Sequence, residues 1–261
     1  MLNTDVATVA ARAEALRALQ STGSFLVMPN AWDAASARIF AKVGFAAIAT
    51  TSGGVAQAVG YEDHENAPAD EMLAAAGRIT RAVDIPVTVD FEAGYGLPAG
   101  EVAQRLIEAG AAGMNIEDTD HHGGSPLVEA ESHAQHLAEI KAAARAGGVN
   151  LVLNARVDPF IQRLGTREEQ LAEGIRRGRL YLDAGADSIY PIGVTDEATI
   201  AALVQALGPI NVMMWPGASP SLARLKEIGV RRVTYATGIF RRLYAQLEEV
   251  ANGIYSEANG A

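Results

Sequence analysis

Two acidic residues stand where a strongly apolar segment of the chain ends. The β-branched residues 87–89 are followed by Asp90, Phe91 and Glu92, and then by Gly94-Tyr95-Gly96. Side chains two positions apart in a strand point to the same side, so Asp90 and Glu92 could face one site together. Carboxylate oxygens are the ligands that a hard cation such as Mg²⁺ prefers. The structural alternative is a strand end at which two acids simply meet solvent.

The size and composition of the chain limit what kind of protein it can be. It has 261 residues, of which 49% are hydrophobic and 20% are charged, and its formal net charge is −10. We treat residues 1–261 as a single domain, because no linker or change of composition divides them. The negative charge argues against a nucleic-acid partner. The absence of cysteine excludes thiolate metal sites and cysteine nucleophiles.

The sequence shows neither a membrane span nor a secretion signal. The first twenty residues lack a basic stretch followed by an apolar one, and no apolar run is long enough to cross a bilayer. We therefore expect a cytoplasmic protein without a membrane partner.

Short apolar runs alternate with longer segments of helical periodicity. Strands are expected at 25–30, 46–51, 86–92, 113–118, 151–156, 188–190, 211–215 and 232–235. Helices are expected at 7–19, 34–43, 69–83, 98–109, 129–146, 167–184, 197–207, 221–228 and 240–251. One leading helix and eight strand–helix units predict an α/β fold, a (β/α)₈ barrel of the TIM type, in preference to an open α/β sheet. The tail, 254–261, is expected to fray or to bind a neighbouring subunit.

Polar residues and small turn residues gather at the carboxyl ends of the expected strands, which form the active face of such a barrel. In chain order they are Asn30, Thr51, Ser52, Gly53, Gly54, Asp90, Glu92, Glu117, Asp118, Asn154, Arg156, Asp158, Tyr190 and Trp215. An uncompensated cluster of acids is costly, and a divalent cation would reduce that cost. The pattern therefore predicts a metal site at the barrel mouth, with Asn154, Tyr190 and Trp215 as candidate substrate contacts.

For three features of this face, a purely structural role is an alternative to a role in binding or catalysis. Arg156 is interpreted as an anion-binding residue, although it could be a counter-ion for a neighbouring acid. The turn at 52–54 could be only a tight turn, but a row of free backbone N–H groups favours carboxylate binding. His121 and His122 could be a metal pair, yet adjacent histidines on a loop are more often structural or solvated.

Several short motifs follow one another along the chain, namely Ser52-Gly53, Gly60-Tyr61-Glu62-Asp63, Asp90-Phe91-Glu92-Ala93-Gly94-Tyr95-Gly96, Asn115-Ile116-Glu117-Asp118 and Asn154-Ala155-Arg156. Their order and spacing resemble those of the isocitrate lyase/phosphoenolpyruvate mutase superfamily. The likeness covers most of the chain up to about residue 195. The resemblance implies a (β/α)₈ barrel and a homotetramer or homodimer, with C-terminal helices swapped between subunits.

The resemblance further implies Mg²⁺ or Mn²⁺ as the cofactor. Asp90 would be the direct metal ligand, and Glu92, Glu117 and Asp63 would hold the ion through water molecules. A small 2-oxo acid would bind to this ion, because chelation polarises its carbonyl group and stabilises the enolate that bond cleavage creates.

The resemblance also implies how the substrate would be held. Backbone amides at Ser52, Gly53 and Gly54 would bind the carboxylate of the 2-oxo acid. Arg156 would bind the departing phosphonate or carboxylate group. The implied chemistry is cleavage of a C–C or a P–C bond.

The sequence departs from the family pattern in three places. Glu92 stands where many relatives have Asp. The loop at 119–125 replaces the Lys-Lys-Cys-Gly-His segment of the lyases, which excludes an isocitrate or methylisocitrate lyase that uses this cysteine. The lid segment of the mutase is not recognisable. We hypothesise that His121 or His122 supplies the proton in place of the missing cysteine.

Our main functional hypothesis is a Mg²⁺-dependent lyase or hydrolase acting on a small 2-oxo acid with a second anionic group. Oxaloacetate decarboxylation, phosphonopyruvate hydrolysis and cleavage of a 2-hydroxy acid all remain open. The alternatives are a phosphoenolpyruvate phosphonomutase and a non-catalytic 2-oxo acid binding protein. A sugar-phosphate barrel that binds phosphate at residues 216–219 and 237–238 is a further alternative.

Overall fold

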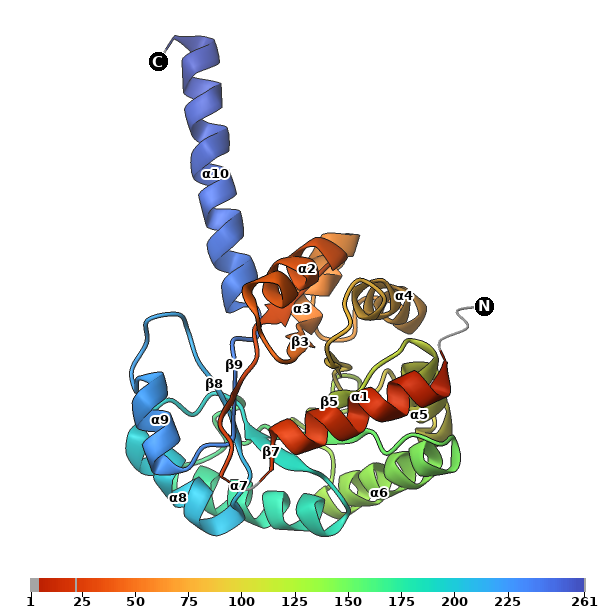
Figure 1. Cartoon of the computed structure of the whole chain (residues 1–261). Coiled ribbons are helices and arrows are strands. Elements are labelled where there is room, and N and C mark those ends of the chain that lie inside the picture. Colours follow the sequence, from red (N-terminus) through yellow and green to blue (C-terminus); the bar gives the residue numbers. More distant parts are fainter. Residues whose placement is uncertain (1–4, 22, 261) are drawn as a thin grey trace.

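The computed structural model describes residues 5–21 and 23–260, which form a barrel of parallel strands surrounded by helices (Figure 1). The strands are β1 (Leu26–Val27), β2 (Asn30–Ala31), β3 (Ile48–Thr50), β4 (Val87–Asp90), β5 (Gly113–Glu117), β6 (Val152–Val157), β7 (Ser188–Pro191), β8 (Asn211–Met213) and β9 (Arg232–Thr234). The helices are α1 (Val6–Leu19), α2 (Ala34–Val43), α3 (Ser52–Val59), α4 (Ala69–Thr80), α5 (Ala99–Glu108), α6 (Ala130–Ala146), α7 (Arg167–Asp183), α8 (Glu197–Leu207), α9 (Leu222–Ile228) and α10 (Gly238–Asn259).

The strands close into a ring. Strands β2 to β7 pair in chain order, and β1, β9 and β8 form the remaining part. A parallel bridge between Ile189 and Ile210 joins the two parts beside β7 and β8. On the other side, β1 pairs with β9 and β2 pairs with β3, so the stretch 26–31 serves as one strand that changes partner around Pro29. The predicted (β/α)₈ barrel is confirmed.

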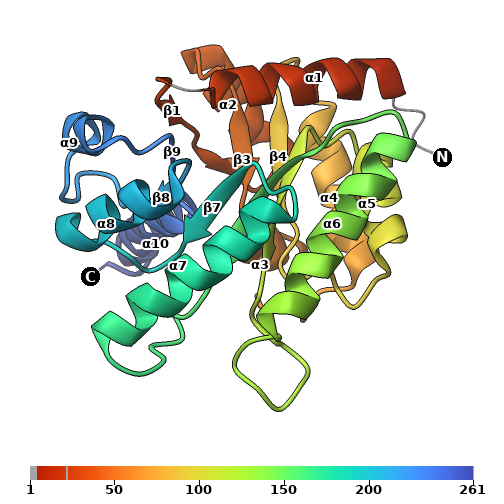
Figure 2. The same cartoon turned by 90° about the horizontal axis from the view of Figure 1, so that it is seen from below.

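The leading helix α1 lies along one side of the barrel, where it packs against α5 and β6 (Figure 2). Its buried face consists of Val9, Ala13 and Leu16, which recur at the spacing of an amphipathic helix. The carboxylate of Asp5 accepts hydrogen bonds from the N–H groups of residues 7 and 8 and caps the helix. The helix that the sequence predicts before the first strand is therefore confirmed.

The sequence did not predict helix α3, which begins at Ser52 where we expected only a turn. Two glycines in its first turn lower the intrinsic helix propensity and conceal it. A Cβ atom at position 53 would lie 2.5 Å from Oδ2 of Asp63, so any larger residue there would displace this carboxylate. The amino end of α3 thus packs directly against the loop that carries Asp63.

Polar side chains fill the barrel interior below its mouth. Nδ2 of Asn154 donates to Oδ1 of Asn115 at 2.8 Å, and Oγ of Ser188 donates to Oδ1 of Asn154 at 2.5 Å. Arg232, which is fully buried, donates to the same Asn115 oxygen at 3.1 Å. Burial lowers the pKa of Arg232 to about 10. These contacts fix Asn115, whose amide group reaches the mouth.

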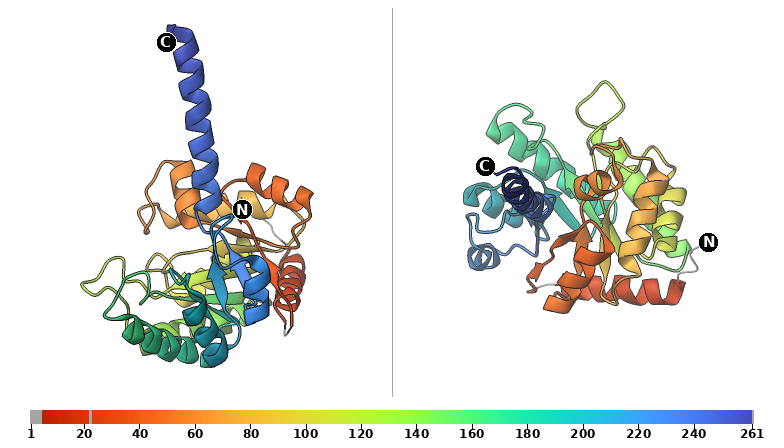
Figure 3. Two further views of the ribbon diagram at one scale, coloured as in Figure 1. Left: turned by 90° about the vertical axis from the view of Figure 1, so that its left-hand side faces the viewer. Right: turned by 90° about the horizontal axis from the view of Figure 1, so that it is seen from above.

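The last helix, α10, runs away from the barrel (Figure 1; Figure 3, left). It continues to Asn259, so the described part of the tail is helical and not frayed, and contact with a neighbouring subunit stays a prediction; residue 261 lies outside the described residues. Leu247, Ile254 and Tyr255 on this helix are more than half exposed. Among the described residues, no helix combines the length and the apolar character that crossing a membrane requires.

Candidate active site

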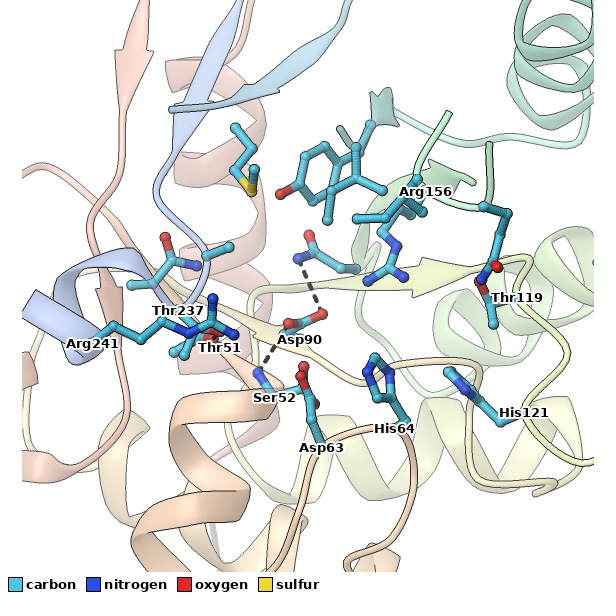
Figure 4. A pocket seen from close by; sticks show the side chains of 18 of the residues that line it. Thr51, Ser52, Asp63, His64, Asp90, Thr119, His121, Arg156, Thr237 and Arg241 are labelled. Atoms are coloured by element: carbon cyan, nitrogen blue, oxygen red, sulfur yellow. Dashed lines mark hydrogen bonds between the residues drawn. The ribbon is translucent and has the colours of Figure 1, made fainter. Parts of the chain in front are cut away.

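A cavity of about 380 Å³ opens at the carboxyl ends of the strands (Figure 4). Its wall is built from nearly every side of the ring, which is how a barrel brings residues distant in sequence together. Residues that line it include Asn30, Ser52, Asp63, His64, Asp90, His121, Arg156, Tyr190, Trp215, Thr237 and Arg241. The volume suits a small organic acid together with a cation.

Asp90 is held at this mouth by two hydrogen bonds. Oδ2 accepts from the backbone N–H of Ser52 at 3.0 Å, and Oδ1 accepts from Nδ2 of Asn115 at 3.3 Å. Ser52 opens α3, so the carboxylate lies at the positive end of a helix. Burial nevertheless raises the pKa of Asp90, and the charge of Asp63 raises it further, against the opposing effects of Arg156 and of Ser52.

Asp63 lies close to Asp90 on the loop after α3, as Figure 4 shows. Its Oδ1 atom is buried and has no hydrogen-bond partner among the described residues. Two carboxylates that face each other, one with an unpartnered oxygen, form a site of excess negative charge. Such a set of hard oxygen donors fits Mg²⁺ or Mn²⁺.

The carboxylate of Glu92 makes its hydrogen bonds with other groups than those that hold Asp90. Strand β4 ends at Asp90, and Glu92 has a φ of +48°, so the alternation that would place both acids on one side stops. Its buried carboxylate accepts hydrogen bonds from the N–H of Glu65, at 2.7 Å, and from the hydroxyl of Tyr95. Burial raises the pKa of Glu92 to about 7, although the bond from Tyr95 opposes the rise. Glu92 is not among the residues that line the cavity, and its role beside Asp90 stays a prediction.

Arg156 is tightly paired with acids in the cavity wall. Nε and Nη2 donate to the two oxygens of Asp158 at 2.7 and 2.6 Å, and Nη1 contacts Glu117. Burial raises the pKa of Glu117 well above its ordinary value, and Arg156 opposes that rise. Glu117 therefore stands behind Arg156 and does not line the cavity itself.

The two adjacent histidines face different surroundings. Nε2 of His121 lies 2.6 Å from Oε1 of Glu117, and only 6% of its side chain is exposed. Nε2 of His122 lies 2.9 Å from Oε2 of Glu65, and 68% of its side chain is exposed. Only His121 lines the cavity, so the structure separates a pair that the sequence could not resolve.

The three predicted substrate contacts also differ in position. Tyr190 and Trp215 line the cavity. Asn154 does not, because it is fully buried one layer below the mouth and bonds to Asn115 and Ser188. Its effect on a substrate would pass through Asn115, which contacts Asp90.

Sequence reasoning missed His64 and Arg241 as site residues. His64 directly follows the motif that contains Asp63, but an exposed loop position after a motif gives no local signal of a site residue. Arg241 belongs to the first turn of α10, and Figure 4 shows its side chain directed toward Thr51 and Thr237. The hydroxyls of these two threonines lie 3.0 Å apart. The sequence contained a partial signal, since residues 237–238 were candidates for phosphate binding.

Comparison with known proteins agrees with this geometry. A protein-family model described as phosphoenolpyruvate phosphomutase matches residues 16–255. The chain belongs to the phosphoenolpyruvate phosphomutase family. It is therefore an enzyme of the isocitrate lyase/phosphoenolpyruvate mutase superfamily, whose members include lyases, mutases and hydrolases.

Three relatives show how broad this phosphomutase family is. The chain is 31% identical over 235 residues to 2-methylisocitrate lyase of Halalkalibacterium halodurans, covering 87% of this chain and 72% of that one. It is 30% identical over 257 residues to oxaloacetate decarboxylase of Pseudomonas savastanoi pv. phaseolicola, covering 93% and 86%. The solved structure of 2,3-dimethylmalate lyase, a superfamily member, is 28% identical with a TM-score of 0.84, covering 95% and 88%.

Proposed function

We propose that this enzyme uses Mg²⁺ or Mn²⁺ to cleave a C–C or P–C bond of a small 2-oxo acid through an enolate. The observation that carries the proposal is the pairing of Asp63 with Asp90 beside the amino end of α3. The acidic pair supplies oxygen ligands for a cation, and the helix end supplies N–H groups for an anion. A 2-oxo acid presents an anion and a carbonyl oxygen within one short molecule.

The residues present fit a divalent cation. Asp90 and Asp63 would hold it, because burial disfavours the charge of Asp90 and one Asp63 oxygen lacks a partner. When bound, the cation would polarise the carbonyl group of the substrate and lower the energy of the enolate.

The carboxylate of the 2-oxo acid would bind at the first turn of α3. The N–H of Ser52 is already bonded to Asp90, whereas the next N–H groups, of Gly53 and Gly54, have no partner within the helix. The absence of a side chain on Gly53 leaves this backbone accessible beside Asp63. This binding mode orients the carbonyl group of the substrate toward the acidic pair.

The second anionic group of the substrate would bind to Arg241. The sequence pointed to Arg156, but that guanidinium is already paired with Asp158 and Glu117. Arg241 has no ion pair with any described residue, and it lines the cavity beside Thr237. Arg156 would then neutralise the acidic wall, and Arg241 would determine which anionic substrates are accepted.

His121 is the group that we assign to proton transfer. Its imidazole contacts Glu117 and lines the cavity, so a proton can be exchanged between substrate and wall at this position. His122 is excluded from this role, because it is exposed and bonded to Glu65.

The test is an assay with oxaloacetate and phosphonopyruvate, with and without EDTA. Pyruvate with CO₂ would identify a decarboxylase, pyruvate with phosphate a phosphonopyruvate hydrolase, and acetate with oxalate an acetylhydrolase. EDTA and the Asp90→Ala substitution should each abolish turnover. Undiminished turnover in EDTA or in Asp90→Ala would refute the proposal, and tight binding of 2-oxo acids without any turnover would favour the non-catalytic alternative.

A further inference from the structure

A fully buried arginine lies in the barrel interior, below the active-site cavity. Arg232 on β9 forms no ion pair with any described residue. Its Nη2 atom donates to Oδ1 of Asn115 at 3.1 Å, whereas Nε and Nη1 have no hydrogen-bond partner in the part of the chain that the structure describes. Burying an unpaired cation is costly, so a protein that retains one is expected to use it.

Asn115 belongs to a chain of hydrogen bonds that runs from β7 to the end of β4. The hydroxyl of Ser188 donates to Oδ1 of Asn154 at 2.5 Å, and Nδ2 of Asn154 donates to Oδ1 of Asn115 at 2.8 Å. Nδ2 of Asn115 in turn donates to Oδ1 of Asp90 at 3.3 Å. A hydroxyl and a carboxamide each contain a donor and an acceptor, so these three polar side chains could reverse their orientation together.

Arg232 opposes this reversal. A guanidinium group has five N–H donors and no acceptor, so the Asn115 atom that it contacts must be the oxygen. The amino group of Asn115 then faces Asp90. An ionised Asp90 favours the same orientation in the absence of a cation. A cation at Asp90 would favour the opposite one, because an amide oxygen is a ligand for Mg²⁺ and an amide NH₂ group is not.

We propose that Arg232 is a positioning residue for the reaction, which keeps the Asn115 amide turned toward Asp90 as a donor when a cation binds. Arg232 does not line the cavity, so it acts through Asn115. Held in this way, the amide oxygen does not take a position on the ion that the substrate needs. The charge of Arg232 also acts at the cavity wall, since Tyr190 and Asp90 oppose the fall in its pKa that burial causes. The inference rests on the proposed function in placing the cation at Asp90.

The test compares Arg232→Met with Arg232→Lys in the full chain. Methionine has neither charge nor donor, whereas lysine keeps a charge and has only donors. Arg232→Met should bind Mg²⁺ at least as tightly as the wild type in isothermal titration calorimetry, because a nearby positive charge is lost and the amide oxygen can turn toward the ion. Its kcat for the 2-oxo acid that the wild type cleaves should fall about tenfold. Arg232→Lys should recover most of this loss.

Two further measurements separate a positioning role from a purely structural one. In urea unfolding with EDTA, Arg232→Met should be at least as stable as the wild type, because Asn115 keeps Asn154 as a donor and an unpaired buried charge is removed. In the Asn115→Ala background, adding Arg232→Met should lower kcat less than twofold further, because the residue through which Arg232 acts is already missing.

Arg231→Met is the matched control. The side chain of this neighbour donates to the carbonyl oxygen of Ser21, away from the barrel interior, so kcat and Mg²⁺ affinity should stay as in the wild type. Unchanged kcat in Arg232→Met, no recovery in Arg232→Lys, or additive losses with Asn115→Ala would overturn the inference. Weaker Mg²⁺ binding together with lower stability in Arg232→Met would do the same, since it would indicate a structural role.

The wild type separates this inference from the proposed function. A wild type that neither binds Mg²⁺ nor cleaves a 2-oxo acid would contradict the proposed function. A wild type that does both, with full activity in Arg232→Met, would refute the role of Arg232 alone.

Discussion

The backbone N–H of Ser52 donates to Oδ2 of Asp90 at 3.0 Å, which joins the first turn of α3 to the end of β4. This bond places an acid whose pKa is raised by burial at the point where a helix presents its positive end. The fold thus holds a charge that it does not need for stability. Such a residue is expected to serve function at the expense of stability.

The substitution Asp90→Asn should separate the contribution of the Asp90 charge to catalysis from its effect on stability. The amide keeps an oxygen that can accept from Ser52 and removes the buried charge, but its NH₂ group then faces the NH₂ group of Asn115, so the metal-free variant should match the wild type in stability to within about 1 kcal/mol. Its kcat/KM should fall at least about a hundredfold, because the cation loses its ligand. Thermal unfolding in EDTA and steady-state kinetics measure the two effects. A variant that is destabilised in EDTA would show that Asp90 is primarily structural.

Stability should depend on pH through His133, which lies outside the active site. Its side chain is buried against Tyr181, with ring centroids 4.9 Å apart, and burial lowers its pKa from 6.5 to about 3. The unfolded chain therefore binds a proton below pH 6.5 that the folded chain does not. The stability contributed by neutral His133 is complete above pH 6.5 and is lost as the pH falls toward 3, by up to about 1.4 kcal/mol per pH unit.

The substitution His133→Phe tests this assignment. It keeps an aromatic ring against Tyr181 and cannot be protonated, so its free energy of unfolding should fall less steeply between pH 6.5 and 4 than that of the wild type. Urea unfolding at several pH values measures the two slopes. The exposed His122 supplies the control, since His122→Gln should keep the wild-type slope. Parallel curves for His133→Phe and the wild type would contradict the prediction.

Arg241 and Arg242 provide a matched pair for substrate specificity. Arg241 lines the active-site cavity, whereas Arg242 lies along a groove formed by α2 and α10. Arg241→Gln should raise KM for a dianionic 2-oxo acid about tenfold or more, because a hydrogen bond to a charged group is lost. Competitive inhibition by a monoanionic 2-oxo acid should change little. An equal effect of Arg242→Gln would mean that only the overall charge of the helix matters.

The sequence predicted the positions of site residues best where those residues lie at the ends of regular strands. Asp90 and Arg156 lie at carboxyl ends of regular strands, so periodicity and the barrel rule place both at the mouth. Glu92 escaped this reasoning because a positive φ interrupts the strand pattern. His64 and Arg241 come from a loop and a helix start, whose directions depend on tertiary packing that no local pattern encodes. Arg232 was missed for a related reason, because a buried arginine can be explained only by the polar interior around it.

The exposed apolar stripe of α10 leads to a prediction about assembly. Leu243, Leu247, Val250 and Ile254 recur along one side of this helix and are each about half exposed or more. A contiguous apolar face of this kind generally marks an interface. We propose that α10 packs against another copy of the chain, as the C-terminal helices swapped between subunits would do. The wild type should therefore be a dimer or tetramer in size-exclusion chromatography with light scattering.

Charges introduced on the two sides of α10 distinguish an interface from a free helix. Leu247→Glu with Ile254→Glu should shift the protein toward monomer, because burying two carboxylates in an apolar contact is costly. Asn252→Glu with Ser256→Glu adds the same charge on the opposite side of the same helix and should leave the assembly intact. A wild type that is monomeric at micromolar concentration would refute the prediction. Dissociation of both double variants would show that the charge of the helix, rather than its apolar side, controls the assembly.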